Sequence, residues 1–329
     1  MANGNGTYPS SSDQDPAWLD GAANTVSLAF IDPSELDDAV RLGEAGGGGL
    51  PLAFEQHVAA LTEKGLRVLF SLGGASFADR WTFLRSEARA RRAAVVCAGW
   101  ARRYGVGIEI DYEGPDAQSA GWTVSSPAGA SRISTTFAHL GAFIEEYRAH
   151  VPFGSKNFGW LTMDLYASQG GAPCLSYFAN RYLPGMPKGN PPWIKSGDAV
   201  GHKLDGLDWI NIMVAGSDAF ASSRAFLDGY VGAAAHVANQ YNPVGIVAAL
   251  PAARATISLI ASNHCKRYDA DLSQMVEYVR GEGVAGIMFW AVAPFGCVSA
   301  SNPLRVADWS CECNSKAPGL VAGKTALLK

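Results

Sequence analysis

Seven short β-rich runs recur along the chain with helical patterns between them, and this alternation constrains the fold more than any other feature. The runs are TVSLAFI (25–31), LRVLFSL (66–72), VGIEIDY (106–112), FGWLTMDLY (158–166), LDWINIMVA (207–215), VGIVAAL (244–250) and VAGIMFWAV (284–292). Several are almost continuously apolar, as strands covered on both faces must be. Between the runs lie amphipathic segments with apolar residues three and four positions apart, such as Phe54–Lys64, Arg92–Tyr104, Ile133–His150, Arg224–Gln240 and Ala270–Glu282.

Consecutive strands begin about 36 to 52 residues apart, which is typical of repeated βα units with right-handed crossovers. No antiparallel or helical block interrupts the series, so it predicts an α/β fold of the TIM (β/α)8 type rather than an open doubly wound sheet. A dinucleotide-binding fold is disfavoured because no GxGxxG opens a helix after the first strand. We expect an irregular N-terminal segment at 1–24, a barrel domain at 25–310 and a C-terminal tail at 311–329.

Only seven strands are visible where a complete barrel has eight, and residues 1–24 contain no strand pattern. The first strand is therefore expected to be missing or replaced. Three explanations stay open: an open or seven-stranded barrel, a C-terminal element at Leu320–Leu328 that fills the gap, or a truncated form of the chain.

Composition and charge exclude several classes of partner. Hydrophobic residues make up 48% of the chain and its formal net charge is -4, with no run of Lys or Arg longer than two. This argues against a nucleic-acid partner, which requires a concentrated cationic surface. No run approaches the ~20 apolar residues that span a bilayer. The first residues lack the pattern of a secretory signal, so the compartment is undetermined.

The cysteines give no sign of a metal site. There are six, without CxxC spacing or a nearby His that would complete a zinc set. We therefore expect neither a metal nor another cofactor. Three of them, Cys174, Cys265 and Cys297, follow predicted strands and so share one end of the barrel, where a disulfide between two of them is a hypothesis.

The stretch GVGIEIDYEG (105–114) places Glu109, Asp111 and Glu113 at alternating positions of a predicted strand. Residues two apart on a strand share a face, with roughly 6.6 Å between them. Inside a barrel, three such carboxylates would raise one another's pKa, and one could hold the proton that a general acid needs at neutral pH. By themselves these residues also fit an exposed strand with a solvated acidic face.

The same strand resembles the DxxDxDxE signature of glycoside hydrolase family 18, the chitinases and their endo-β-N-acetylglucosaminidase relatives. The preceding run LFSLGGASF (69–77) is similar to the family's SxGG strand, and GIMFWAV (286–292) resembles the strand whose Trp floors the sugar subsite. TVSLAFI, LDWINIMV and VGIVAALPA resemble the second, sixth and seventh strands. The likeness covers about residues 25–295 and slightly favours an extracellular protein.

The resemblance implies retaining hydrolysis assisted by the substrate's own acetamido group. Glu113 would be the general acid and base, and Asp111 would orient the acetamido group. Glu109 would stand where the family has an Asp that shares a proton with its neighbour. Trp290 would stack under the sugar, which makes a chitin-like or N-acetylglucosamine-containing glycan the expected partner.

Further substrate-binding candidates are Gly73 and Gly74 of the SxGG-like strand and Met213 of the sixth strand. Asp164 and Tyr166 end the run WLTMDLY with the same inward parity, so each has either a pocket role or an ordinary role at a strand end. Asp32 follows the first predicted strand, and two interpretations stay open for it. It is either a residue of the pocket or a helix cap preceding Pro33.

Three positions depart from the family pattern. Val106 replaces the first Asp of the signature, Glu109 replaces another Asp, and Ala215 stands where relatives carry a Tyr that donates a hydrogen bond to the acetamido group. Losing one such donor typically costs ~10²–10³ in rate. Two hypotheses follow: a hydrolase of β-1,4-linked N-acetylglucosamine glycans, or a catalytically silent relative that binds a glycan or a protein.

Overall fold

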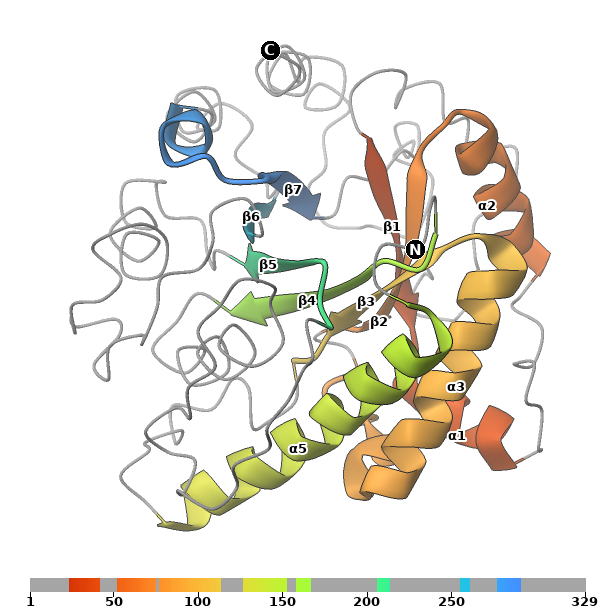
Figure 1. Ribbon diagram of the computed structural model, residues 1–329, viewed down its shortest axis with the longest axis vertical. Helices are drawn as coiled ribbons and strands as arrows, with labels where there is room; N and C mark the ends of the chain where they lie inside the picture. The colour runs from red at the N-terminus through yellow and green to blue at the C-terminus, as the bar shows by residue number, and fades with distance from the viewer. Residues whose placement is uncertain are drawn as a thin grey trace, which may run out of the picture.

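The computed structural model describes residues 24–41, 52–74, 77–113, 127–152, 158–166, 206–213, 255–260 and 277–290. Within these ranges seven parallel strands form one sheet in the order β1-β2-β3-β4-β5-β6-β7. The strands are β1 Thr25–Ile31, β2 Arg67–Gly73, β3 Gly107–Asp111, β4 Leu161–Tyr166, β5 Trp209–Met213, β6 Ala255–Ile260 and β7 Gly286–Trp290. The sheet curls with its helices outside it, so the predicted α/β barrel of TIM type is confirmed (Figure 1). No strand of the described residues precedes β1, in agreement with a missing or replaced first strand.

Six of the seven predicted runs contain a strand of the structure. The run 244–250 lies outside the described residues. The strand that pairs between β5 and β7 is β6, with the sequence ATISLI, which is not among the predicted runs. In this strand Thr256 and Ser258 alternate with apolar residues, a pattern that is typical of a strand. It closely follows the more strongly apolar run 244–250, which the sequence pattern favours as the strand instead.

The helices with defined bounds are α1 Pro33–Arg41, α2 Leu52–Glu63, η4 Thr82–Arg85, α3 Glu87–Tyr104 and α5 Pro127–His150, of which α2, α3 and α5 match predicted segments. Residues 277–282 are also helical and fall within the predicted segment Ala270–Glu282. The unpredicted α1 begins at a cap, since Asp32 Oδ1 accepts hydrogen bonds from Ser34 N at 2.9 Å and Ser34 Oγ at 2.7 Å. The helix-cap interpretation of Asp32 is thus confirmed. Among the described helices, none has the length and apolar character that crossing a bilayer requires.

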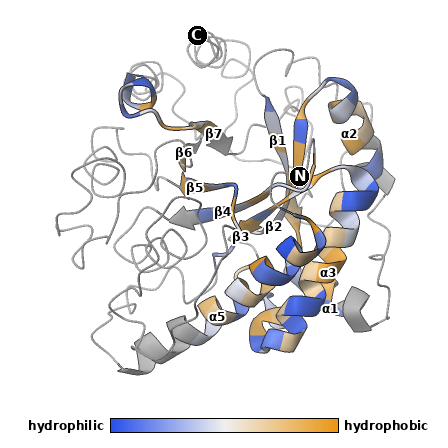
Figure 2. Cartoon of the chain, viewed as in Figure 1, coloured by the Kyte–Doolittle hydropathy of each residue, from blue (hydrophilic) through white to orange (hydrophobic). Residues whose placement is uncertain are grey.

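Helix α3 packs against both α5 and the sheet through small side chains. Ser86 caps its first turn, and Gly105 ends it at φ 69°, with the Gly105 N–H donating to Ala101 O at 3.0 Å. The buried face is rich in alanine, which lets the backbones approach closely; its members are Ala90, Ala93, Ala94, Val96, Cys97, Ala98, Trp100 and Ala101. In Figure 2, α3 and α5 each carry hydrophobic and hydrophilic residues around their surface, as amphipathic outer helices must.

Alternate residues of each strand face the helices or the barrel interior. Those that face the helices belong to one buried apolar cluster with α3 and α5; they include Val68, Phe70, Leu72, Ile108, Ile110, Leu161, Met163, Ile210 and Ile212. The other set faces the barrel interior, which we call the lumen. It contains Ser71, Glu109, Asp111, Thr162, Asp164 and Asn211, all of which are buried.

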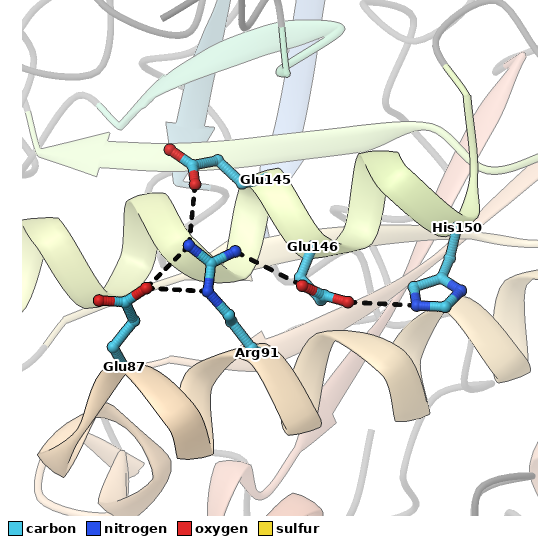
Figure 3. Close-up of polar contacts among 5 residues, drawn as sticks. All are labelled: Glu87, Arg91, Glu145, Glu146 and His150. Carbon is cyan, nitrogen blue, oxygen red and sulfur yellow. Dashed lines mark hydrogen bonds and ion pairs between the residues drawn. The ribbon is translucent and has the colours of Figure 1, made fainter. Parts of the chain in front are cut away.

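A surface network of charges joins α3 to α5. The Arg91 guanidinium lies between Glu87 of its own helix and Glu145 and Glu146 of α5, at N–O distances of 2.8, 3.1 and 3.4 Å (Figure 3). Glu146 also contacts His150 at 3.2 Å. The Arg91 side chain is 36% exposed, so solvent weakens these attractions.

A second arginine of α5 is largely buried and binds the chain at the beginning of β4 and β5. Arg148 donates to Gly206 O at 2.6 Å, to Gly159 O at 2.9 Å and to Asp208 Oδ2 at 2.5 Å. The same Asp208 oxygen accepts the Leu161 N–H at 2.7 Å. We call this group the Arg148 clamp. It lies at the amino ends of the strands, which in barrels serve stability and not catalysis.

Candidate active site

The lumen of this barrel is polar where barrels of this type usually carry bulky branched side chains. Strand pairing sets Ser71 of β2 and Thr162 of β4 level with Glu109 of β3, on either side of it. The next level aligns Asp164 of β4 with Asn211 of β5 and Thr256 of β6. The residues next to Glu109 in both levels are therefore short hydroxyl, carboxyl or amide side chains.

Glu109 is held from two sides of the lumen. Its Oε1 accepts a hydrogen bond from Ser27 Oγ of β1 at 2.6 Å, and its Oε2 accepts one from Asn211 Nδ2 of β5 at 3.1 Å. The residue is 2% exposed, so the alternative of a solvated acidic strand is wrong. Burial raises the pKa of Glu109, and the hydrogen bonds that it accepts oppose this rise.

Asn211 uses all four of its hydrogen-bonding sites. Its amide nitrogen donates to Glu109 and also to Asp164 Oδ1 at 2.5 Å, while its oxygen accepts from Trp209 Nε1 at 3.0 Å and from Thr256 Oγ1. An indole N–H can only donate, so the amide oxygen must face Trp209. The amide nitrogen consequently faces the two carboxyl groups, and the orientation of the side chain follows from its partners.

Asp111 ends β3 and is 4% exposed. Its Oδ1 is buried and has no hydrogen-bond partner among the described residues. Burial raises the pKa of Asp111 well above its usual value, and the negative charges of Glu113 and Glu109 raise it further. Asp111 is thus a carboxyl group that holds a proton readily and has an oxygen open to a new partner.

Two more carboxyl groups complete the cluster. Glu113 follows β3 by two residues and is half-buried, so it lies nearer to solvent than Asp111. Asp164 is 2% exposed, and its pKa is raised well above the usual value by burial and by the charges of Glu109 and Asp111, against the hydrogen bond from Asn211. We call Glu109, Asp111, Glu113 and Asp164 the carboxyl cluster.

Gly73 and Gly74 adopt conformations that favour glycine and lie against the end of β3. At Gly73, φ is +105°, and a Cβ would come within 2.3 Å of both Asp111 O and a Trp81 ring atom. At Gly74, φ is +79°, and a Cβ would come within 2.6 Å of the Phe30 ring. The Gly74 N–H donates to Asp111 O at 2.9 Å, so this turn fixes the backbone of Asp111.

The backbone register places the predicted residues Tyr166, Met213 and Trp290 at the ends of their strands. Tyr166 pairs in register with Met213, and Trp290 pairs with Ile260 at the end of β7. All three thus lie at the carboxyl ends of their strands, where the binding face of such barrels forms. The Ala215 departure and the proposed cysteine pairing lie outside the described residues. The same holds for most of the N-terminal segment and for the C-terminal tail.

Sequence reasoning missed Ser27, Asn211 and Thr256, which hold the cluster in place. Asn211 could have been found from the sequence, because it is the one uncharged polar residue in the strand WINIM and has the parity that faces the lumen. A buried amide at such a position must find several partners. Ser27 left a weaker signal, since serine is small enough to lie in many environments.

Fold and site together define the class: a TIM-type α/β barrel with a carboxyl cluster that lies on β3 and β4 and on the residues just after β3. No sequence-family model and no curated protein matches the chain.

Solved structures do resemble it. One is a family 18 chitinase from Pseudoalteromonas aurantia, with 13% identity and a TM-score of 0.55 over 94% of this chain and 95% of that one. Another is a family 18 chitinase from Cycas revoluta in complex with (GlcNAc)3, with 14% identity and a TM-score of 0.51 over 94% and 95%. A third is a chitinase-like agglutinin from Robinia pseudoacacia, with 14% identity and a TM-score of 0.50 over 96% and 95%. The chain has the fold of family 18 chitinases.

Proposed function

We propose that this protein is a chitinase-like glycoside hydrolase that cleaves β-1,4-linked N-acetylglucosamine glycans by a retaining, substrate-assisted mechanism. The observation that carries the proposal is Asp111, a buried carboxyl group with an oxygen that no other described residue contacts by a hydrogen bond, two residues before the half-buried Glu113. The chitinase-like fold supports the substrate class, since a neighbour of the same fold was crystallised with (GlcNAc)3.

In this mechanism Glu113 protonates the glycosidic oxygen while the acetamido oxygen of the same sugar attacks the anomeric carbon. The bond to the leaving oxygen breaks, and its electron pair departs with that oxygen, so a cyclic oxazolinium ion forms on the substrate. Water then attacks the anomeric carbon, the bond from that carbon to the acetamido oxygen breaks and the acetamido group is restored, and the water gives its proton to Glu113, which restores the acid. Asp111 orients the acetamido group so that its oxygen reaches the anomeric carbon.

The remaining predicted residues bind the sugar. Trp290 would floor the subsite by stacking on the pyranose ring, and Tyr166, Met213 and Asp164 would line it. Gly73 and Gly74 would contribute by fixing the backbone of Asp111 at the end of β3. Trp290, Tyr166 and Met213 are supported by their positions at the carboxyl ends of neighbouring strands.

A catalytically silent glycan-binding protein is the second candidate. It is favoured by the agglutinin of the same fold and by the contacts of Glu109. Both oxygens of Glu109 accept hydrogen bonds from Ser27 and Asn211, so Glu109 is not free to exchange a proton with Asp111 as the family's Asp would. Ala215 removes a further family donor to the acetamido group.

Hydrolysis of chitin oligosaccharides by the wild type and by Glu113→Gln tests the proposal. Removing the general acid should lower kcat by about 10²–10⁴-fold with a smaller effect on binding. Glu63→Gln is a matched control, because this carboxylate is exposed at the end of α2 and should leave turnover unchanged.

Calorimetry with the same oligosaccharides separates the two candidates. Binding without turnover by the wild type would contradict the hydrolase and support the silent binder. Absence of both binding and turnover would overturn the glycan assignment.

A further inference from the structure

Asn211 connects two members of the carboxyl cluster that lie on different strands. Its amide nitrogen donates one hydrogen to Glu109 of β3 and the other to Asp164 of β4, over 3.1 and 2.5 Å. Asn211 is 1% exposed, so no solvent competes for these bonds. Trp209 and Thr256 hold the amide oxygen on the opposite side, which prevents the side chain from reversing.

This bridge separates the functions of Glu109 and Asp111. With Ser27 on one oxygen and Asn211 on the other, the Glu109 carboxyl group is drawn across the lumen toward β1 and β5. Asp111, two residues further along the same strand, keeps an oxygen without a partner among the described residues. A Glu109 released from Asn211 would be free to turn toward Asp111 and engage that oxygen.

We propose that Asn211 is a positioning residue of the carboxyl cluster: it fixes Glu109 as the charged member and so leaves for the substrate the Asp111 oxygen that has no partner among the described residues. The importance of this role for catalysis rests on the proposed function. The effect of Asn211 on the charge of Glu109 is a property of the substrate-free protein and can be measured without any substrate.

The distribution of protons follows from the number of donors that each carboxyl group has. Glu109 accepts from two donors, which favours its charged form, whereas Asp111 Oδ1 has none among the described residues. The charged groups acting on Asp164 from the described elements are Glu109, Asp111 and Glu113, and all three disfavour its ionisation. The lumen should therefore concentrate its negative charge on Glu109 and keep protons on Asp111 and Asp164.

Infrared spectroscopy of the substrate-free protein tests this inference. The carbonyl band of protonated carboxyl groups is followed from pH 4 to pH 9 in the wild type and in Asn211→Leu, which keeps the side-chain size but removes both donors. Losing one hydrogen bond to a charged group should raise the apparent pKa of Glu109 by about one to two pH units. The band should therefore persist to higher pH in the variant.

Two further variants guard against a purely structural effect. Ile212→Ala truncates the neighbouring buried residue that faces the helices, so it should lower stability without moving the titration. Trp209→Phe removes only the donor that fixes the orientation of the amide, and it should shift the band in the same direction by less. The Trp209 variant also replaces Asn211→Leu in the assay if the latter does not fold.

The outcomes distinguish the inference from the proposed function. Superimposable titrations of the wild type, Asn211→Leu and Trp209→Phe would overturn the positioning role, even if the wild type hydrolyses chitin oligosaccharides. A shifted titration in a protein without turnover would support the positioning role while the hydrolase proposal fails. In an active enzyme, the pH profile of kcat/KM should shift with the infrared titration, and an unchanged profile would contradict the inference.

Discussion

Replacing Arg148 with Met should lower the free energy of unfolding far more than removing the surface arginine of the same helix pair. Arg148 is 7% exposed in its side chain and binds two backbone carbonyls and Asp208. Met keeps much of the apolar stem but supplies no donor, so Asp208 keeps a buried charge without its partner. Breaking a buried pair from one side costs about 3–5 kcal/mol.

Arg91→Met is the matched control, since Arg91 also pairs with carboxylates between α3 and α5 but is 36% exposed. Exposed ion pairs contribute about 0–1 kcal/mol, so the two variants should differ by at least about 2 kcal/mol. That difference is a large part of the roughly 5–15 kcal/mol by which proteins are stable.

Urea unfolding followed by tryptophan fluorescence measures both variants, and equal m-values would show that the midpoints report stability. Arg148→Lys should be intermediate, because one ammonium group cannot reach all the partners of the guanidinium fork. In the double variant Arg148→Met/Asp208→Asn, the combined loss should be smaller than the sum of the single losses, since the uncompensated charge is gone. An Arg148→Met cost no larger than that of Arg91→Met would refute the reasoning.

Three further predictions concern the lumen and the core. The raised pKa of Asp164 means that the folded protein keeps a proton that the unfolded chain releases above about pH 3.9, so its contribution to stability is present at acidic pH and falls as pH rises toward the folded pKa. Asp164→Asn should flatten that fall when urea unfolding is compared at pH 4 and pH 7, and an unchanged slope would contradict the raised pKa. Gly73→Ala should lower the unfolding midpoint more than Gly105→Ala, because both residues have positive φ but only the Cβ at Gly73 would collide, with Trp81 among others; equal losses would count against the close contact. The Cys97 thiol is fully buried and burial raises its pKa, so peptide mapping should find it unmodified by a maleimide until the protein is unfolded, and labelling in the native state would show that the core opens.

The barrel could be predicted because the strand pattern depends only on residues that are close together in the sequence. Alternation in GIEID placed Glu109 and Asp111 on one face, and the apolar runs on either side implied strands covered by helices. Burial of both carboxyl groups follows from those two facts together. The helix-cap interpretation of Asp32 also rested on local sequence, namely the Pro33 that follows it.

The partners of the carboxyl cluster could not be predicted in this way. Ser27 lies 82 residues from Glu109 along the chain, and Asn211 lies 102 residues from it. Whether their side chains meet depends on the register between strands and on the curl of the sheet. The apolar pattern of a strand constrains its parity but not its offset along the barrel axis. Strand β6 was missed for a different reason, because the apolar run 244–250 just before it was predicted as the strand.

The contact between an indole and an amide oxygen in the fifth strand has a consequence for how proteins of this architecture are sorted. Trp209 carries no charge and donates its indole N–H to Asn211, yet it decides which end of Asn211 the acids meet. A survey that separates hydrolases from agglutinins by their acidic residues alone would overlook such neutral determinants. Anyone who grafts this acidic motif onto another barrel would have to transplant the tryptophan and the asparagine along with it.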